Sequence, residues 1–231
     1  FVYAYDGLQI TDIEFVYDPK GYIQIYKDVN DIDLYVIGGD TSGDGSDYFV
    51  GQVLNNRTGE QVAVLRHQFD EDVYARQMYC LGKYYNYALL AIESNFSTYP
   101  IKELQRLGYE NMFYRQQEDK ITKKLTDRYG VRTTAVTRPI MIAGLVTVVR
   151  ENTEWINDLD TIREMITFVR NEKGKAEAQE GCHDDMVMAL AIAYYAREQQ
   201  DKFRLIKAEK KKELPIELRA EPVVQGGMIE W

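Results

Sequence analysis

The stretch Asp33-Leu34-Tyr35-Val36-Ile37-Gly38-Gly39-Asp40 is a short apolar run that ends in a carboxylate. Two more apolar runs follow at residues 48–54 and 61–66, and a polar turn at residues 55–59 separates them. Short apolar runs joined by turns predict an antiparallel meander of three strands. Asp40 then lies at the end of the first central strand, which makes it a candidate functional residue.

Helices and strands alternate in the rest of the chain. The acidic residues 70–72 predict the start of a helix that runs to about residue 85. Ala88-Leu89-Leu90-Ala91-Ile92 predicts a buried strand that ends at Glu93. Further helices are predicted at residues 97–108, 137–150, 160–168 and from 183 past 195, with a strand at 112–115. This order predicts an α/β domain with a mixed central sheet flanked by helices.

The two ends of the chain stand apart from this core. Two short apolar runs around the turn Asp18-Pro19-Lys20-Gly21 predict an N-terminal hairpin at about residues 12–28. We therefore expect one domain at residues 1–200, including this hairpin, and a C-terminal tail at residues 201–231. The chain begins with Phe1 and lacks a signal-like segment, so we expect a piece of a longer polypeptide.

Composition limits the classes of protein. Of the 231 residues, 45% are hydrophobic and 12% aromatic, which argues against disorder over most of the chain. Lys plus Arg number 28 and Asp plus Glu 37, so the net charge of −9 disfavours a free-standing nucleic-acid binder unless a basic strip is local. No apolar run reaches the roughly 18–20 residues that span a bilayer. Two cysteines and two histidines are too few for a typical Cys/His zinc cluster.

Four acidic residues lie where predicted elements begin or end. Asp40 and Glu93 follow strands, and Asp184 and Asp185 open the last long helix. Neighbouring strands would place Asp40 beside Glu93, and the helix would bring Asp184 or Asp185 to the same point. Carboxylates gathered in this way repel one another without a cation, and hard oxygen ligands favour Mg²⁺ or Mn²⁺. Two such ions about 3.5–4 Å apart can hydrolyse a phosphodiester.

Each of these acids also fits an ordinary structural role. Asp40 opens a loop rich in Gly, Ser and Asp, where turn residues are common, and Glu93 is typical of a helix cap or a solvent-facing acid. Paired acids at a helix start complement the helix dipole. The loop after Asp40 partly mimics a calcium-binding EF-hand, but its twelfth position is Gly51, where a bidentate Glu is required. The joint placement of the four acids is what favours a metal site.

Four stretches occur in a distinctive order. They are Tyr35-Val36-Ile37-Gly38-Gly39-Asp40-Thr41 followed by Gly45-Ser46-Asp47-Tyr48; Leu90-Ala91-Ile92-Glu93-Ser94-Asn95; Thr137-Arg138-Pro139; and Phe168-Val169-Arg170 with Gly174-Lys175-Ala176-Glu177-Ala178 and Gly181-Cys182-His183-Asp184-Asp185-Met186-Val187-Met188-Ala189-Leu190-Ala191. Together they cover about residues 30–197. In this order the sequence resembles the nuclease domain of the large terminase subunit of tailed bacteriophages, which has an RNase H-like fold.

The resemblance implies a metal-dependent endodeoxyribonuclease. Asp40 and Glu93 would be the first and second metal-binding acids, and the pair Asp184/Asp185 would supply the third, around two ions of Mg²⁺ or Mn²⁺. Of this pair, either residue could bind the metal directly. The remaining two candidates lie nearby in the motifs: His183 would orient a carboxylate or a phosphate, and Asp47 would tie down the loop or act from outside the metal's ligands.

The resemblance also implies a role in viral DNA packaging. In this family the nuclease cuts concatemeric double-stranded DNA at the start and end of packaging, in the host cytoplasm during virion assembly. The implied partners are double-stranded DNA, the terminase ATPase domain, the portal protein and the small terminase subunit, with no membrane. We expect the ATPase domain to be absent from this chain, because no Gly-x-x-x-x-Gly-Lys-Ser/Thr loop is present. A non-catalytic module that docks the portal, or another RNase H-like enzyme such as a resolvase, are the alternatives.

A local basic strip lies in the polar residues 116–136, which are predicted to form a loop or small hairpin. Placed beside the metal site, these cations would hold DNA phosphates, and the equally good alternative is a solvated loop. The strip consists of Lys120, Lys123, Lys124, Arg128 and Arg132.

Overall fold

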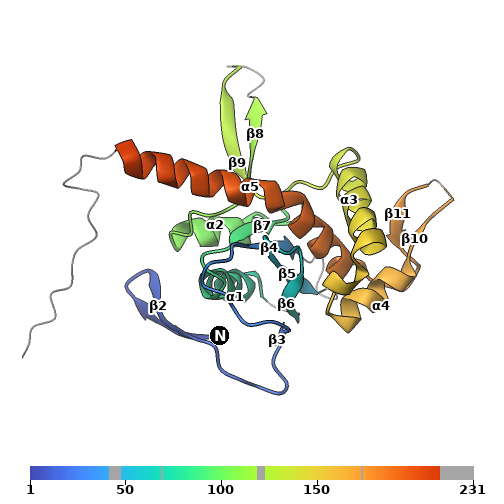
Figure 1. The fold of residues 1–231 in the computed structure, drawn as a ribbon, viewed down its shortest axis with the longest axis horizontal. Coiled ribbons are helices and arrows are strands. Elements are labelled where there is room, and N and C mark those ends of the chain that lie inside the picture. Colours follow the sequence, from blue (N-terminus) through green and yellow to red (C-terminus); the bar gives the residue numbers. More distant parts are fainter. Residues whose placement is uncertain (42–47, 69, 119–122, 173, 214–231) are drawn as a thin grey trace, which may run out of the picture. The chain divides into compact units, whose positions relative to one another are not determined.

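The computed structural model describes residues 1–41, 48–68, 70–118, 123–172 and 174–213, with side chains described to Gln200 (Figure 1). The contacts divide the chain into two units, Phe1–Gln200 and Asp201–Trp231. The sheet, the helices that cover it and the candidate site all belong to the first unit. In the described part of the chain, no helix is both long and apolar enough to cross a membrane.

A mixed sheet of five strands forms the centre of the first unit, in the spatial order β3-β6-β5-β4-β7. The predicted meander is confirmed, because β4, β5 and β6 pair antiparallel in succession. β7 pairs with β4 in parallel, as expected for a strand that follows a crossover helix. The strands are β3 (Ile23–Ile25), β4 (Tyr35–Asp40), β5 (Phe49–Asn55), β6 (Gln61–His67) and β7 (Leu89–Ile92).

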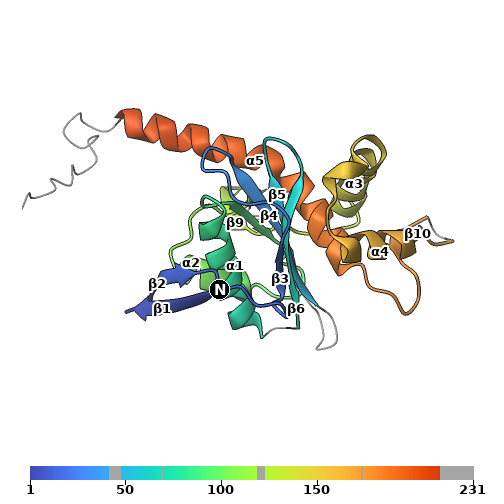
Figure 2. The same cartoon turned by 60° about the horizontal axis from the view of Figure 1, so that its bottom comes forward.

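Helices cover both faces of this sheet, so the predicted α/β class is confirmed. α1 (Glu71–Tyr84) and α2 (Tyr99–Arg106) pack with one face, and the first part of α5 (Asp185–Glu213) lies on the other (Figure 2). Two adjacent glycines in β4 allow α5 to approach the strand from one face and α1 from the other. A Cβ at Gly38 would lie 2.1 Å from the Ala189 carbonyl oxygen in α5, and a Cβ at Gly39 would lie 2.5 Å from the Tyr74 hydroxyl in α1. β4 and β7 are accordingly buried along their whole length.

The remaining elements extend this core. Met112 and Val131 form parallel bridges to Leu90 and Glu93, so the chain on either side of a long hairpin continues the sheet beyond β7. The hairpin projects from the body in Figure 1. These elements are the hairpin strands β8 (Tyr114–Glu118) and β9 (Leu125–Tyr129), α3 (Thr137–Glu151), the 3₁₀ turn η1 (Thr153–Trp155), α4 (Leu159–Thr167) and the small hairpin β10 (Phe168–Arg170) with β11 (Ala176–Ala178).

The expected hairpin at residues 12–28 is wrong. The N-terminal hairpin is instead β1 (Val2–Asp6) with β2 (Gln9–Glu14), closed at Gly7, whose φ of 59° suits a glycine. Ile23–Ile25 is an edge strand that pairs with β6 in the central sheet. Phe15 lies after the end of β2 and outside any strand, and its ring packs against Phe1 and Tyr84. At the other end, α5 continues to Glu213, so the segment predicted as a tail from residue 201 begins as helix.

Candidate functional site

The ends of β4 and β7 bring two carboxyl groups together. The Glu93 amide donates to the carbonyl oxygen of Gly39 at 2.9 Å, which places Glu93 beside Asp40, the last residue of β4. Both residues are buried, with 9% of Asp40 and 5% of Glu93 exposed. This placement follows directly from the parallel pairing of two apolar strands that each end in an acid.

Asp40 lies in the environment of a buried acid surrounded by other acids. Burial raises the pKa of Asp40 well above its ordinary value, the neighbouring Glu93 carboxyl raises it further, and Asp185 and Asp184 add to the effect. Each of these causes disfavours the charged form of Asp40. A bound cation would offset the repulsion from Glu93, Asp184 and Asp185, because it attracts the same carboxylates that repel one another.

The acids at the start of α5 face the same cleft and are each held in place. Asp184 accepts a hydrogen bond from the Arg138 guanidinium, at 2.6 Å between Nη2 and Oδ2. Asp185 accepts from the backbone amide of Tyr48, at 3.3 Å between the nitrogen and Oδ2. Arg138 also donates to the Ala176 carbonyl oxygen at 3.3 Å, so it ties the β10–β11 hairpin to the start of α5.

A cleft of about 490 Å³ connects these groups. It contains two cations whose positions the motifs included without assigning them a role, Arg138 and Lys175. The Lys175 ammonium lies 2.7 Å from a Glu177 carboxylate oxygen. The polar lining consists of Asp40, Thr41, Glu93, Asn95, Thr133, Arg138, Lys175, Glu177, Asp184 and Asp185. Five acids and two cations in one cleft make it suited to metal ions and to a phosphate.

The donor set fits a hard cation. The hydroxyl groups of Thr41 and Thr133 are buried in the cleft lining and have no hydrogen-bond partner among the described residues, so water molecules around an ion would satisfy them. Oxygen donors of this kind suit Mg²⁺ or Mn²⁺. Within the described ranges, however, no three His, Cys, Asp or Glu side chains gather at metal-binding distance. Asp184 is instead paired with Arg138.

The two residues predicted to assist the acids have different outcomes. His183 is half-exposed and its Nδ1 lies 3.9 Å from Asp185 Oδ2, close enough to influence that carboxylate. Its ring also meets the Tyr48 ring edge-on, at 6.3 Å between centroids. Asp47 lies outside the residues that the structure describes.

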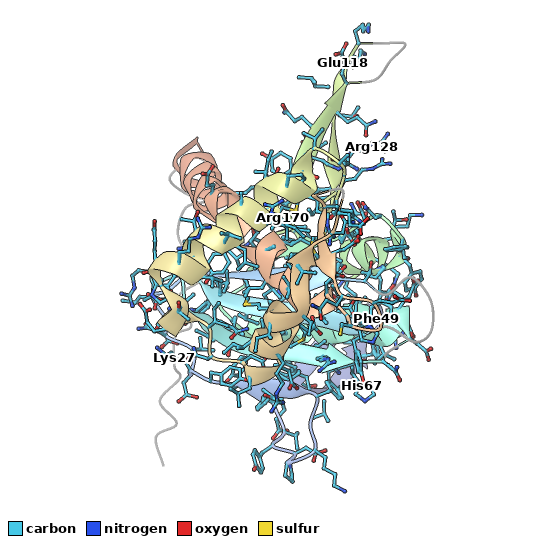
Figure 3. All side chains as sticks on the ribbon, turned by 90° about the vertical axis from the view of Figure 1, so that its right-hand side faces the viewer. Lys27, Phe49, His67, Glu118, Arg128 and Arg170 are labelled. Carbon is cyan, nitrogen blue, oxygen red and sulfur yellow. The ribbon has the colours of Figure 1, made fainter. Side chains whose placement is uncertain are left out.

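The described residues of the basic strip run from Lys123, next to the β8–β9 turn, through β9 to Arg132, where the chain leads into the site. The Ser94 amide donates to the Val131 carbonyl oxygen at 2.8 Å, so Arg132 follows a residue paired beside Glu93. Figure 3 shows Arg128 near the base of the hairpin and Glu118 near its tip. Lys123 and Lys124 are exposed near that tip, where Lys123 lies 3.4 Å from Glu118. Lys120 lies outside the described residues.

Arg115 is a cation of this hairpin that the sequence did not reveal. It is the direct cross-strand partner of Arg128. Burial lowers the pKa of its guanidinium, and the nearby charges of Arg132 and Arg128 lower it further. Arg115, Arg128 and Arg132 therefore gather near the hairpin base. The sequence predicts Arg115 at the end of a strand just before the strip, and the strand register places it opposite Arg128.

Comparison with known proteins gives a result at the level of structure. No protein-family model matches the sequence, and no curated protein matches it. The large terminase nuclease of thermophilic phage G20c, solved with bound magnesium, matches with a TM-score of 0.61 at 21% identity, over 78% of this chain and 89% of that one. The same nuclease with bound cobalt also gives 0.61 at 21% identity, with the same coverage of 78% and 89%.

The large terminase nuclease domain of Thermus phage P74-26 matches with a TM-score of 0.59 at 22% identity, over 77% of this chain and 87% of that one. These likenesses establish the fold. The mixed sheet with flanking helices is that of the large terminase nucleases, and the resemblance predicted from the sequence is confirmed at that level.

Proposed function

We propose that the chain is a metal-dependent endonuclease that cuts double-stranded DNA by phosphodiester hydrolysis. The observation that carries this proposal is the cleft in which Asp40 and Glu93, at the ends of adjacent parallel strands, face Asp184 and Asp185. Support comes from the shared fold with nucleases that were solved with magnesium and cobalt bound.

The four acids would hold two ions of Mg²⁺ or Mn²⁺. Bound there, such ions supply an activated water and stabilise the leaving 3′ oxygen. Of the two acids at the start of α5, we favour Asp185 as the direct ligand. Asp184 is paired with Arg138, and Asp185 acts on Asp40 more strongly than Asp184 does.

The chain's other charged groups would bind and orient the DNA. Lys175 lines the cleft and would contact the phosphate next to the cleaved bond. Arg115, Arg128 and Arg132, near the hairpin base, would hold phosphates on the adjoining stretch of duplex. His183 would orient Asp185 or a phosphate.

In the cell we propose a role in packaging viral DNA. The chain would cut concatemeric double-stranded DNA in the host cytoplasm during virion assembly. Its partners would be a terminase ATPase domain, the portal protein and the small terminase subunit. This context is carried over from the terminase nucleases, which share the fold.

Nicking of supercoiled plasmid tests the proposal. The chain is incubated with plasmid and Mg²⁺ or Mn²⁺, beside Asp40→Asn, Glu93→Gln and Asp185→Asn, and the matched control Glu154→Gln changes an exposed acid on η1. We expect cutting by the wild type and the control, and at least about a hundredfold loss in the site variants. Equal cutting by all variants, or no cutting together with no metal binding by calorimetry, would contradict the nuclease proposal.

A further inference from the structure

The first turn of α5 is capped from a neighbouring helix. Backbone amides in the first turn of a helix lack a partner within the helix. Glu164 on α4 reaches this turn, and its Oε2 accepts the amide of Met186 at 2.8 Å. Asp184, just before the helix, is used differently, because its carboxylate accepts from Arg138. A side chain outside the cleft lining thus holds the turn that carries two of the candidate ligands.

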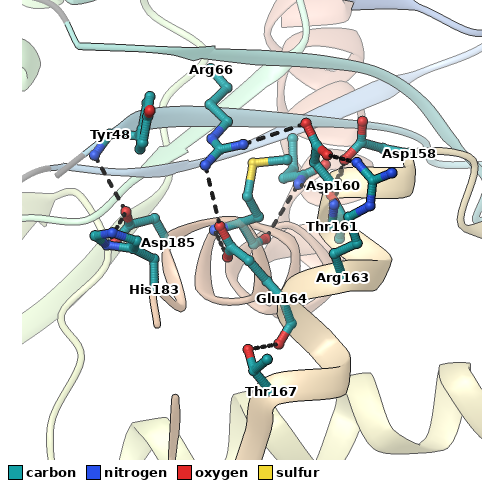
Figure 4. Close-up of polar contacts among 12 residues, drawn as sticks. Tyr48, Arg66, Asp158, Asp160, Thr161, Arg163, Glu164, Thr167, His183 and Asp185 are labelled. Carbon is teal, nitrogen blue, oxygen red and sulfur yellow. Dashed lines mark hydrogen bonds and ion pairs between the residues drawn. The ribbon is translucent and has the colours of Figure 1, made fainter. Parts of the chain in front are cut away.

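Arg66, in β6, connects Glu164 to the other side of the same turn (Figure 4). One guanidinium nitrogen lies 4.0 Å from Glu164 Oε1 and another lies 3.4 Å from Asp160 Oδ2. The guanidinium carbon lies 4.1 Å from the centre of the Tyr48 ring. The Tyr48 amide donates to Asp185. Arg66 therefore contacts both Glu164, which holds the Met186 amide, and Tyr48, which holds Asp185.

The geometry favours positioning over simple pairing. The Glu164 side chain is only 11% exposed, so its contacts restrict it. Within the described residues, Glu164 Oε1 and Arg66 Nε make no hydrogen bond, and the two side chains meet only through the 4.0 Å contact. An ion pair of greatest strength would be bidentate. Here Glu164 instead gives its well-formed bond to the helix amide, and its main effect is therefore on where α5 begins.

We propose that Glu164 and Arg66 are positioning residues that fix the first turn of α5, and with it Asp184 and Asp185, opposite Asp40 and Glu93. The inference rests on the proposed metal-dependent function, because that function gives the placement of the acids its importance. Both residues act through α5 and Tyr48 rather than on the DNA. Without them the first turn frays, and the two acids occupy a wider range of positions.

Hydrogen exchange tests whether Glu164 holds the turn. Glu164→Ala removes the acceptor, Glu164→Gln keeps a carbonyl oxygen in its place, and Arg66→Gln removes the cation. The control Ile101→Val, in α2 on the other face of the sheet, lowers stability without contacting α5. In Glu164→Ala we expect exchange in residues 185–190 to rise about tenfold, with smaller rises in Glu164→Gln and Arg66→Gln and none in Ile101→Val. Unchanged exchange there in a folded Glu164→Ala protein would overturn the proposal.

Metal titration tests whether the held turn matters for the acids. The melting temperature is followed against Mn²⁺ concentration for the same variants. We expect Glu164→Ala to need several times more Mn²⁺ for half of the full shift, Glu164→Gln to restore most of the wild-type value, and Ile101→Val to leave it unchanged. A lower melting temperature in chelator with an unchanged half-saturating concentration would overturn the positioning role. A wild type that shows no Mn²⁺ effect would overturn the proposed function instead, and the exchange result would still decide whether Glu164 holds α5.

Discussion

At the residue scale, the negative charge of Asp40 opposes the fold. It is buried beside Glu93, and Asp185 and Asp184 add to the repulsion. Asp40→Asn keeps the shape and removes this repulsion. We therefore expect the variant to melt at a higher temperature than the wild type in chelator at pH 8, and to lose the stabilisation that Mg²⁺ or Mn²⁺ gives the wild type. Thermal denaturation with and without metal measures both effects.

The control for this comparison is Asp31→Asn, an exposed acid that is absent from the cleft lining. It should change neither melting temperature by more than a degree or so. If Asp40→Asn were less stable than the wild type in chelator, Asp40 would make a favourable contact that outweighs the repulsion from the neighbouring acids.

Glu164 gives a second prediction at this scale, for pH. The pKa of Glu164 is raised to about 7. Burial is the largest cause and the Asp185 charge raises the pKa further, while the hydrogen bond from the Met186 amide and the charge of Arg66 lower it. The folded pKa lies above the unfolded value of about 4.3. The folded state therefore binds the proton more tightly, and stability from this group is present below about pH 4 and lost as the pH rises toward 7. As the pH rises from 5 to 8 in chelator, the stability of Glu164→Gln should therefore increase relative to that of the wild type.

Melting temperatures of both proteins at each pH unit in chelator measure this difference. Because both proteins share all other titrating groups, the difference curve isolates Glu164. Parallel curves across this range would contradict a raised pKa for Glu164.

At the element scale, α5 packs closely against β4. A Cβ at Gly38 would lie 2.1 Å from the Ala189 carbonyl oxygen and 2.4 Å from the Ala193 amide nitrogen, both backbone atoms that cannot move aside. We expect Gly38→Ala to cost about 3 kcal/mol or more, or to prevent folding. The matched control is Gly144→Ala in α3, where a Cβ meets nothing within 4 Å and the change should stabilise by about 0.5–1 kcal/mol. Urea denaturation compares them, and equal stability of the two variants would contradict this packing.

The β8–β9 hairpin carries a prediction about DNA. Arg115 and Arg128 are cross-strand neighbours on one element, so each should neutralise a phosphate of the same duplex. We expect Arg115→Gln and Arg128→Gln each to weaken DNA binding at every sequence and to lower the slope of log affinity against log salt by about 1. Lys20→Gln, on an exposed loop near the N-terminus, is the control. A salt slope that is the same in all four proteins would remove the hairpin from the DNA-binding surface.

Elements also show how far the sequence alone could go. The runs before Asp40 and Glu93 are apolar because β4 and β7 are buried on both faces, so both could be predicted as strands, while their pairing could only be assumed. The N-terminal hairpin was not, because its strands β1 and β2 are mostly exposed and carry no comparable apolar run. Arg115 and Glu164 escaped prediction for another reason. Each acts through a tertiary contact, one across a hairpin and one between helices, that chain order does not encode.

At the scale of the whole molecule, the net charge of −9 sets the conditions for binding DNA. The β8–β9 hairpin carries the cross-strand pair Arg115 and Arg128, while the cleft is lined mainly by acids, which repel phosphates. Divalent ions in the cleft would convert that repulsion into attraction. The chain alone should therefore bind duplex DNA weakly in chelator and more tightly with a divalent ion.

The final prediction follows from this division of charge. With Ca²⁺, used as a hard ion in place of Mg²⁺, we expect the affinity for a short duplex to rise about tenfold over that in chelator, which corresponds to about 1.4 kcal/mol. Asp40→Asn should lose most of this rise in affinity, because the ion then lacks the Asp40 carboxylate as a ligand. Arg128→Gln should weaken binding equally with Ca²⁺ and in chelator, since the hairpin acts independently of the metal. Fluorescence anisotropy at constant ionic strength measures all three proteins. A Ca²⁺ effect of the same size in Asp40→Asn would place the responsible ion outside the cleft.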